Sequence, residues 1–278
     1  MKKVLSFILA FAMILSVASC GASGGGKDRL ARIKEKGYLE MITEPYWAPN
    51  EFIDPTKTGD EQYVGLDIEL GKYIAEKIGV TLKVIPLEFT AVQTGITEAK
   101  YDMAISALAW SPSRDENMYL SDGYEYDSTA GYGFLVRAED KDKYTSIDSL
   151  KDAVVITQSG AVQEGIYNEY CNNAKEFKRV SSMTDAYLAV KENKADVCIT
   201  ALSSAELFVE ANPGYAVPDF VFDTDKKYSS TVVAIPKGAE NDSLMKIINQ
   251  CIKELTEQKK FDEWSEYYKE YAKSLGLE

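Results

Sequence analysis

Histidine is absent from the 278 residues of this chain. Without it, no Ser-His-Asp triad or Cys-His pair can form, and no zinc site can use an imidazole ligand. Cysteine is scarce as well: apart from Cys20, the chain holds only Cys171, Cys198 and Cys251, which are far apart, odd in number and without CxxC spacing. The sequence therefore predicts no disulfide framework, no metal site and no cofactor. Cys198, inside an apolar stretch, is expected to be a small buried hydrophobe.

Basic residues are also in short supply. Lys and Arg number 31 against 44 Asp and Glu, which gives a formal net charge of −13. Removal of residues 1–19 takes away two lysines and no acid, so the charge becomes −15. A strongly negative chain is unsuited to nucleic acid or to anionic lipid surfaces. The 259 residues that remain suffice for one large or two medium domains.

Long apolar runs are missing except near the start of the chain, where Val4–Val17 follows two lysines and precedes small residues. This pattern is typical of an export signal, and the run is short for a membrane-spanning helix. Residues 17–20, VASC, resemble the bacterial lipoprotein box, in which the cysteine becomes the lipidated first residue. We therefore expect a signal peptide over 1–19, and over 20–28 a lipidated Cys20 with a glycine-rich tether to the outer face of the cell membrane. The alternative is an ordinary signal peptide with an incidental cysteine.

The most informative stretch is Lys100–Asn117, KYDMAISALAWSPSRDEN. Its apolar start predicts a buried strand over Tyr101–Ser106, because strands covered on both faces show no polar alternation. The run 111–113 breaks the strand, and Ser113 is expected to cap a short helix. Arg114 then lies just beyond the carboxyl end of a strand, where open α/β sheets bind ligands and a guanidinium can grip a carboxylate with two parallel hydrogen bonds. Taken alone, Arg114 would be a solvated surface arginine.

Apolar periodicity predicts an α/β order around this stretch. Strands over 38–43 and 81–87 flank an amphipathic helix that begins near Asp67 and ends at Gly79, and a helix over 90–99 leads to the Arg114 segment. The order βαβαβ argues for a mostly parallel sheet. Farther along, a strand over 153–157 precedes the glycine turn QSGAVQE of residues 158–164. The apolar strand ADVCIT of residues 195–200 echoes YDMAIS of residues 101–106.

Four of these strings resemble the family-3 solute-binding proteins, the amino-acid receptors of ABC importers. They are YDMAIS with SPSR, the aromatic loop EPYWAP of residues 44–49, GLDIEL of residues 65–70, and QSGAVQE. The resemblance covers nearly the whole mature chain. It implies an α/β fold of the two-lobed periplasmic-binding-protein type II, in which each lobe is a mostly parallel sheet flanked by helices and two crossover strands join the lobes.

The same resemblance gives expected boundaries. Lobe 1 comprises 29–123 and 232–278, lobe 2 comprises 129–226, and the hinge strands are 124–128 and 227–231. A ligand between the lobes would have its carboxylate on Arg114 and on backbone N–H groups of the glycine turn, with aromatic walls on either side. The implied ligand-binding residues are Glu44, Trp47, Phe89, Ala107, Ala109, Trp110, Arg114, Gln158, Gly160, Val162, Thr200 and Ala201.

One departure from the family pattern bears on the ligand. The second lobe's strand usually ends in an aspartate that holds the ligand's ammonium, and here that position is Ala201, while the usual hydroxyl of the first lobe is Ala109. A buried ammonium without a carboxylate is costly. Either Glu44 takes the cation instead, or the ligand is not a standard α-amino acid and Trp47, Phe89 and Trp110 enclose an apolar or cationic group.

The resemblance implies a monomeric, non-enzymatic receptor that delivers a small amino-acid-like carboxylate to an ABC permease and its ATPase. Closure of the lobes would be a population shift driven by ligand contacts to both. The first alternative is a secreted enzyme on the same scaffold, similar to cyclohexadienyl dehydratase, for which Glu44 is the only candidate acid or base. The second is a sensing module that signals through a partner; no membrane-spanning or signalling segment is seen after residue 278, which disfavours it.

Overall fold

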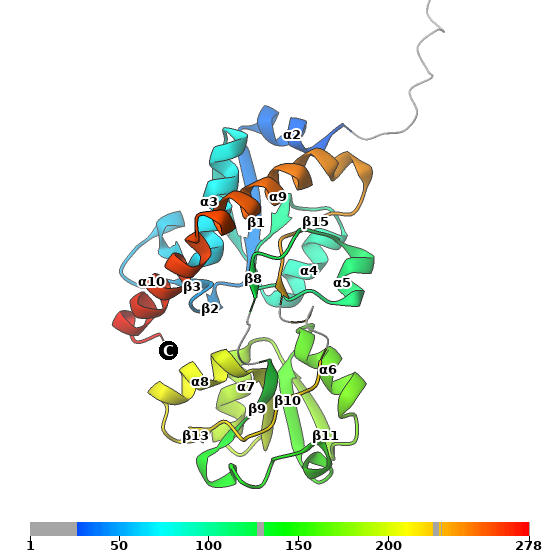
Figure 1. Cartoon of the computed structure of the whole chain (residues 1–278), viewed down its shortest axis with the longest axis vertical. Helices are drawn as coiled ribbons and strands as arrows, with labels where there is room; N and C mark the ends of the chain where they lie inside the picture. The colour runs from blue at the N-terminus through cyan, green and yellow to red at the C-terminus, as the bar shows by residue number, and fades with distance from the viewer. Residues whose placement is uncertain (1–26, 127–130, 225–227, 229, 278) are drawn as a thin grey trace, which may run out of the picture.

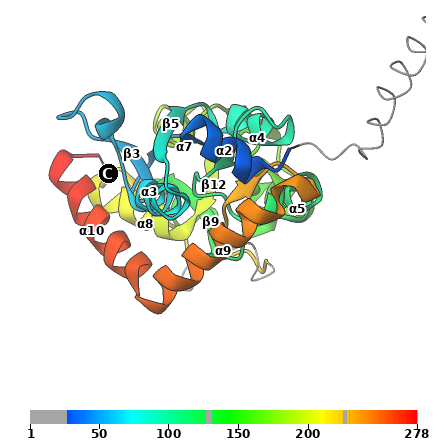
Figure 2. The same ribbon diagram turned by 90° about the horizontal axis from the view of Figure 1, so that it is seen from above.

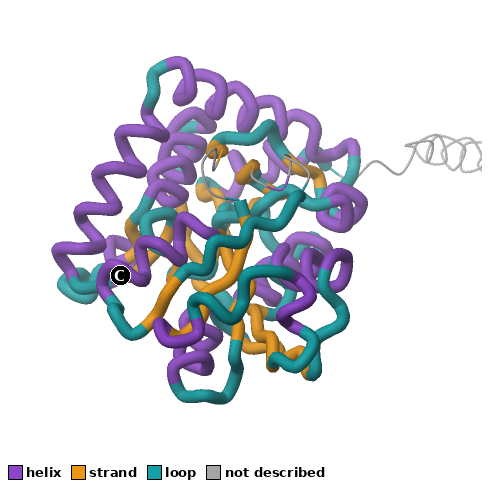
Figure 3. Tube along the Cα trace, turned by 60° about the horizontal axis from the view of Figure 1, so that its bottom comes forward, coloured by secondary structure: helices purple, strands orange, loops and turns teal. Residues whose placement is uncertain are grey.

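The chain forms two α/β lobes that lie one above the other in Figure 1. This computed structural model describes residues 27–126, 131–224, 228 and 230–277. The expected signal peptide, Cys20 and most of the tether lie outside these ranges, as do residues 127–128, 227 and 229 of the expected hinge strands and residues 129–130 and 225–226 of the expected lobe 2. Helices cover the strands of both lobes from outside (Figure 3).

The upper lobe is built on a five-stranded sheet of order β5-β1-β6-β15-β7. β1 pairs in parallel with β5 and β6, whereas β15 pairs antiparallel with β6 and β7. Successive β1 residues enter different apolar clusters: Met41 packs with α3 and α9, and Ile42 packs with α4. The strands are β1 Tyr38–Thr43, β5 Thr81–Pro86, β6 Met103–Ala104, β7 Tyr119–Leu120 and β15 Ala234–Ile235.

The lower lobe repeats this arrangement with the order β11-β10-β12-β9-β13. β10 pairs in parallel with β11 and β12, and β9 pairs antiparallel with β12 and β13. In each sheet four of the five strands run in the same direction, and β15 or β9 alone runs against them, so both sheets are mostly parallel as expected. The strands are β9 Tyr132–Arg137, β10 Val154–Gln158, β11 Glu176–Val180, β12 Val197–Ala201 and β13 Tyr215–Ala216.

Helices cover both faces of each sheet. α3 packs on α9 and α4 on β1 in the upper lobe, while α6 packs on β12 from one side and α7 from the other in the lower lobe. The helices are α2 Arg29–Lys36, α3 Leu66–Ile78, α4 Phe89–Thr97, α5 Pro112–Asn117, α6 Val162–Tyr170, α7 Met183–Lys191, α8 Leu202–Ala211, α9 Asp242–Glu257 and α10 Lys260–Leu275. Short 3₁₀ segments are Gly59–Gln62, Ala138–Asp140, Ile147–Leu150 and Ala239–Asn241.

Two small sheets complete the fold. β8, Glu125–Tyr126, pairs antiparallel with β14, Ser230–Thr231, at the level between the two large sheets. A second small sheet joins β2, β3 and β4, which are Tyr46–Trp47, Glu51–Ile53 and Tyr63–Val64. This meander follows β1 directly and carries the aromatic loop to the space between the lobes.

The segment that leads to Arg114 differs in detail from the expectation. The ladder of β6 covers only Met103–Ala104, because the backbone turns away and Ala107 adopts a left-handed φ of 42°. The cap of α5 is Ser111, not Ser113: the Ser111 hydroxyl accepts a hydrogen bond from the N–H of Arg114. Pro112 occupies the first helical position, where its fixed φ suits a helix start.

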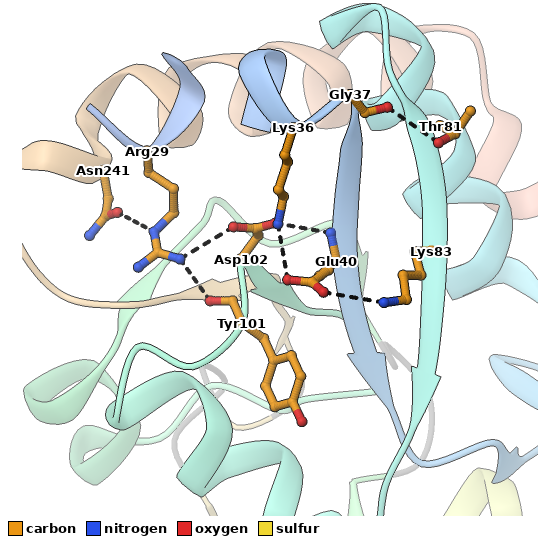
Figure 4. A network of polar contacts seen from close by, with 9 residues as sticks. All are labelled: Arg29, Lys36, Gly37, Glu40, Thr81, Lys83, Tyr101, Asp102 and Asn241. Atoms are coloured by element: carbon orange, nitrogen blue, oxygen red, sulfur yellow. Dashed lines mark hydrogen bonds and ion pairs between the residues drawn. The ribbon is translucent and has the colours of Figure 1, made fainter. Parts of the chain in front are cut away.

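Each central strand is anchored at the end opposite the space between the lobes. Asp102, just before β6, accepts hydrogen bonds from the N–H of Glu40 at 3.0 Å and from Lys36 at 2.6 Å, and pairs with buried Arg29 at 3.3 Å (Figure 4). Asp196, just before β12, similarly accepts from the N–H of Val154 at 2.9 Å and pairs with Arg137 at 3.1 Å. The sequence echo between these strands is therefore an echo of structure as well.

The three cysteines of the described part are free, buried thiols, and Cys198 is fully buried in a lower-lobe core as expected. Within the same part, no group of three or more His, Cys, Asp or Glu residues could hold a metal ion. No helix of the described ranges has the length and apolar character needed to cross a membrane.

Candidate functional site

A cleft of about 930 Å³ separates the two lobes. Its walls include the carboxyl ends of β1 and β12 and the first turn of α6, and it extends along α8 and α10. α5 and α6 lie on the right of Figure 1 and α8 and α10 on the left, an arrangement that Figure 2 repeats for α5, α8 and α10 from above. The cleft wall includes the following expected ligand residues: Glu44, Trp47, Phe89, Ala107, Ala109, Arg114, Gln158, Val162 and Ala201.

Arg114 is a buried cation on this wall, with only 5% of its surface exposed. Its Nη1 donates to the carbonyl of Ala109 at 2.5 Å, its Nη2 donates to the carbonyl of Gly160 at 3.1 Å, and its guanidinium lies 5.3 Å from the ring centre of Phe89. Burial lowers its pKa to about 10, and no acid within the described ranges forms an ion pair with it. A guanidinium so placed lacks a counter-ion, which a ligand carboxylate could supply.

The glycine turn faces Arg114 from the lower lobe. Gly160 has a φ of 73°, a left-handed backbone conformation that favours glycine, and a Cβ there would lie 2.7 Å from Nε2 of Gln93 and push that side chain aside. Its carbonyl accepts from Arg114 and Gln93, but its N–H donates to Glu164 at 2.8 Å. The N–H of Gly160 is thus already engaged. The donors left for an anion are those of the first turn of α6, which begins at Val162.

Glu44 is a buried acid at the carboxyl end of β1. Both of its carboxylate oxygens accept from Nε2 of Gln158, at 2.9 and 2.7 Å, and it also accepts from the N–H of Phe89. Burial nevertheless raises the pKa of Glu44 to about 7. Gln158 belongs to the lower lobe, so this pair ties the two lobes together. Gln158 was expected to contact the ligand with its side chain, and in this structure that side chain donates to Glu44.

Beneath Glu44 lies a pair of buried carboxyl groups, Glu51 and Asp67. Asp67 is fully buried and accepts from the N–H of Ala107 and the hydroxyl of Tyr124, each at 2.7 Å. Oε2 of Glu51 receives no hydrogen bond within the described ranges, and burial beside Asp67 raises the pKa of Glu51 well above its usual value. A proton on Glu51, donated to Asp67, satisfies both groups. Asp67, which the sequence indicated only as a favourable helix start, therefore holds the backbone of the cleft wall.

Three expected ligand residues do not lie on the cleft wall. Thr200 is fully buried, and its hydroxyl bonds to that of Tyr187 at 2.6 Å. Trp110 packs edge-on against Tyr228, with ring centres 6.2 Å apart. Gly160 directs its carbonyl oxygen to the guanidinium of Arg114. Alternation along β12 points Thr200 to the side opposite Ala201, which explains why its side chain lies away from the cleft wall.

Other wall residues were missed by the sequence analysis. Tyr132 and Tyr228 lie on the wall where the chain passes between the lobes, and no local pattern signals them. Gln163 is buried on the wall and was visible in the string QSGAVQE, although no role was assigned to it. The residues that α10 contributes, such as Lys269 and Glu266, belong to a face that looked like a solvated helix surface.

The comparison that decides the family is a match over most of the described chain. The model for bacterial extracellular solute-binding proteins, family 3, matches residues 39–271. The chain belongs to this family. The match confirms the resemblance found in the sequence, since it spans the aromatic loop, the Arg114 segment and both sheets.

Similar proteins agree with this assignment. The arginine-binding extracellular protein ArtP of Bacillus subtilis is 26% identical over 262 residues, which cover 92% of this chain and 93% of ArtP. A crystal structure of the amino acid ABC transporter substrate-binding protein AbpA of Streptococcus pneumoniae, bound to L-arginine, superimposes with a TM-score of 0.78. It is 28% identical and covers 89% of this chain and 99% of AbpA. These likenesses confirm the two-lobed fold.

One relative is an enzyme. The cyclohexadienyl dehydratase of Pseudomonas aeruginosa is 23% identical over 207 residues, which cover 74% of this chain and 73% of the dehydratase. It matches a smaller share of the chain than ArtP does and at lower identity. The family-3 scaffold thus supports both binding and catalysis, and the residues in the cleft must decide between them.

Glu44 allows a test of cleft electrostatics in this family-3 protein without any ligand. Its raised pKa means that the folded state resists ionisation, so stability is lost as the pH rises from about 4.5 to about 7. We expect Glu44→Gln to be more stable than wild type by about 1–2 kcal/mol at about pH 8 and to lose this advantage below about pH 4.5. Urea unfolding across this range measures the difference, with exposed Glu61→Gln as the matched control. A difference that does not vary with pH would contradict the raised pKa.

Proposed function

We propose that this chain is a non-enzymatic receptor that binds a small amino-acid-like carboxylate solute between its lobes and delivers it to an ABC importer. The observation that carries the proposal is Arg114, a buried guanidinium on the cleft wall with no acidic partner in the described ranges. An unpaired buried cation is costly and persists where it has a role. ArtP and AbpA, which bind arginine, support the solute class.

The proposal includes closure of the lobes around the solute. Arg114 and Gln158 already link the lobes through Gly160 and Glu44, so a solute that contacts these groups would touch both sides. The proposed lobe boundaries are 29–123 with 232–278, and 129–226; the proposed hinge comprises 124–128 and 227–231. Pairing of β8 with β14 supports a hinge of two adjacent strands. Ligand contacts to both lobes would shift the population toward the closed form, which then docks on the permease.

A screen by thermal shift over amino acids, betaines and small carboxylates tests this function. A ligand at a hundred times its dissociation constant stabilises the folded state by about 2.7 kcal/mol, which raises the melting temperature measurably. We expect at least one carboxylate solute to do so, and calorimetry then gives its affinity. If only solutes without a carboxylate stabilise the protein, the proposed class is wrong.

The proposed location is the outer face of the bacterial cell membrane. A lipid on Cys20 would anchor the protein there, and the receptor would be a monomer held by the glycine-rich tether. The string VASC and the glycine-rich residues that follow support it. We expect Cys20→Ala to move the protein from the membrane fraction to the soluble extracytoplasmic fraction, as judged by immunoblotting. Retention of Cys20→Ala on the membrane would refute the anchor and leave the binding function untouched.

A further inference from the structure

The end of the cleft around Arg114 combines one buried positive charge with the amino ends of two helices. The guanidinium supplies a full positive charge there, with carbonyl oxygens as its protein partners. The first turn of α6 opens onto the cleft through Val162, and α8 begins directly after Ala201, which places no side chain over the N–H groups of its first turn. The amino ends of helices favour anions and disfavour cations.

Three polar groups near this end already have protein partners. The hydroxyl of Ser106 accepts from the N–H of Glu44 and lies 3.3 Å from Oε1 of Glu51, while the hydroxyl of Thr200 bonds to Tyr187. Burial beside Asp67 raises the pKa of Glu51 well above its usual value, which favours the neutral carboxyl at this place. Ala107, Ala109 and Ala201 add methyl groups to this wall, and the charge-free polar side chains beside them are Gln163, Ser203 and Ser204, so none of these six side chains carries an anion.

A primary ammonium next to the carboxylate would have to enter this same end, because one carbon carries both groups. It brings three N–H donors, and burying them without an anion costs several kcal/mol. Glu44 is the remaining buried acid on the wall. Phe89 contacts both Glu44 and Arg114: its ring lies against the guanidinium of Arg114, and its backbone N–H donates to the carboxylate of Glu44. The wall acids Glu206, Glu210, Asp262 and Glu266 belong to α8 and α10, and none of them is buried, unlike Glu44.

We propose that the solute has no primary ammonium on the carbon next to its carboxylate, and that any positive charge it carries lies farther along, where Glu44 accepts it. This inference rests on the proposed receptor function and narrows its solute class to carboxylates such as ω-amino and ω-guanidino acids or their uncharged counterparts. Trp47 and Phe89 supply apolar walls for the chain between the two ends.

Matched pairs of compounds test the inference, because each pair differs only in the α-amino group. The pairs are L-arginine with 5-guanidinopentanoate, L-lysine with 6-aminohexanoate, and L-phenylalanine with 3-phenylpropanoate. Calorimetry on the full mature chain should show at least tenfold tighter binding of the deaminated member in each pair that binds. Equal or tighter binding of the amino acid overturns the inference, and so does failure of all six compounds at millimolar concentration.

Ala201→Asp provides the complementary test. It adds a carboxylate at the cleft end of β12, and aspartate is a favoured helix N-cap, so α8 tolerates it. We expect the preference within the best pair to shift at least tenfold toward the amino acid. Ala201→Asn caps the helix equally well without charge and should leave the preference unchanged. No shift in the aspartate variant, or an equal shift in both, overturns the inference.

Arg114→Met separates failure of this inference from failure of the receptor function. If the amino acid of a pair binds more tightly than its deaminated counterpart and this binding still requires Arg114, only the inference on the solute class is refuted. If binding of the winning compound is indifferent to Arg114→Met, the carboxylate site itself is misplaced and the proposed function falls with it.

Discussion

Arg114→Met should abolish binding of the carboxylate solute while leaving the protein folded. Removing one partner of a buried charge pair costs roughly 2–5 kcal/mol, so the dissociation constant should rise by a factor of about 30 to several thousand. The unliganded protein should lose little stability, since burial without an anion already disfavours the guanidinium, and methionine fills similar space with apolar atoms. If Arg114→Met binds poorly but its urea midpoint equals or exceeds that of the wild type, the guanidinium serves ligand binding and not stability.

Two controls sharpen this experiment. Arg32→Met removes an exposed arginine and should change neither affinity nor stability. Arg114→Lys keeps the charge but lacks the planar fork, so it should recover only part of the lost affinity. Wild-type affinity in Arg114→Met would place the carboxylate elsewhere, and a loss of several kcal/mol in its unfolding free energy would assign Arg114 a structural role.

Asp67→Ala should lower the free energy of unfolding severely, by about 3–5 kcal/mol. It leaves the hydroxyl of Tyr124, the N–H of Ala107 and the carboxyl of Glu51 without their common partner in a fully buried place. Urea unfolding followed by far-ultraviolet circular dichroism measures the loss, and exposed Asp60→Ala is the matched control. A loss below about 1 kcal/mol would mean that these buried groups find other partners.

Glu51→Gln separates the two members of this pair. The amide can donate to Asp67 and accept from Ser106, as the protonated carboxyl does, so we expect a change within about 1 kcal/mol at pH 5. At higher pH the wild type must either keep a proton on Glu51 or bury a second charge, because the pKa of Glu51 lies well above its usual value. The variant should therefore gain stability over wild type as the pH rises. The reverse trend would show that Glu51 is ionised in the folded protein.

The order of strands and helices followed from local patterns. Unalternating apolar strands, a helix ended by Gly79 and a helix that leads to the Arg114 segment are each set by a few consecutive residues, and the structure contains all of them. The position of Arg114 beyond the end of β6 also followed, because a serine–proline break after a buried strand leaves few alternatives. Local chemistry is sufficient wherever a feature depends on neighbours in the chain.

What could not be anticipated depends on residues brought together from afar. Glu51 looked like an ordinary acid in a loop, and only its packing against Asp67 of α3 turns it into a neutral donor. The N–H of Gly160 was expected to face the ligand, and the side chain of Glu164 on the next helical turn takes it instead. One residue of strand register decides between cleft and core, and it turns the hydroxyl of Thr200 toward Tyr187.

The anchors at the far ends of the central strands bear on how such receptors diversify. Asp102 with Arg29 and Asp196 with Arg137 fix β6 and β12 at the end away from the cleft. Substitutions at the other end, for example at Ala109 or Ala201, leave both anchors intact. Mutations that change which solute the receptor binds therefore need not compromise folding. Drift at a few cleft positions could thus turn one receptor gene into many, each suited to a different nutrient.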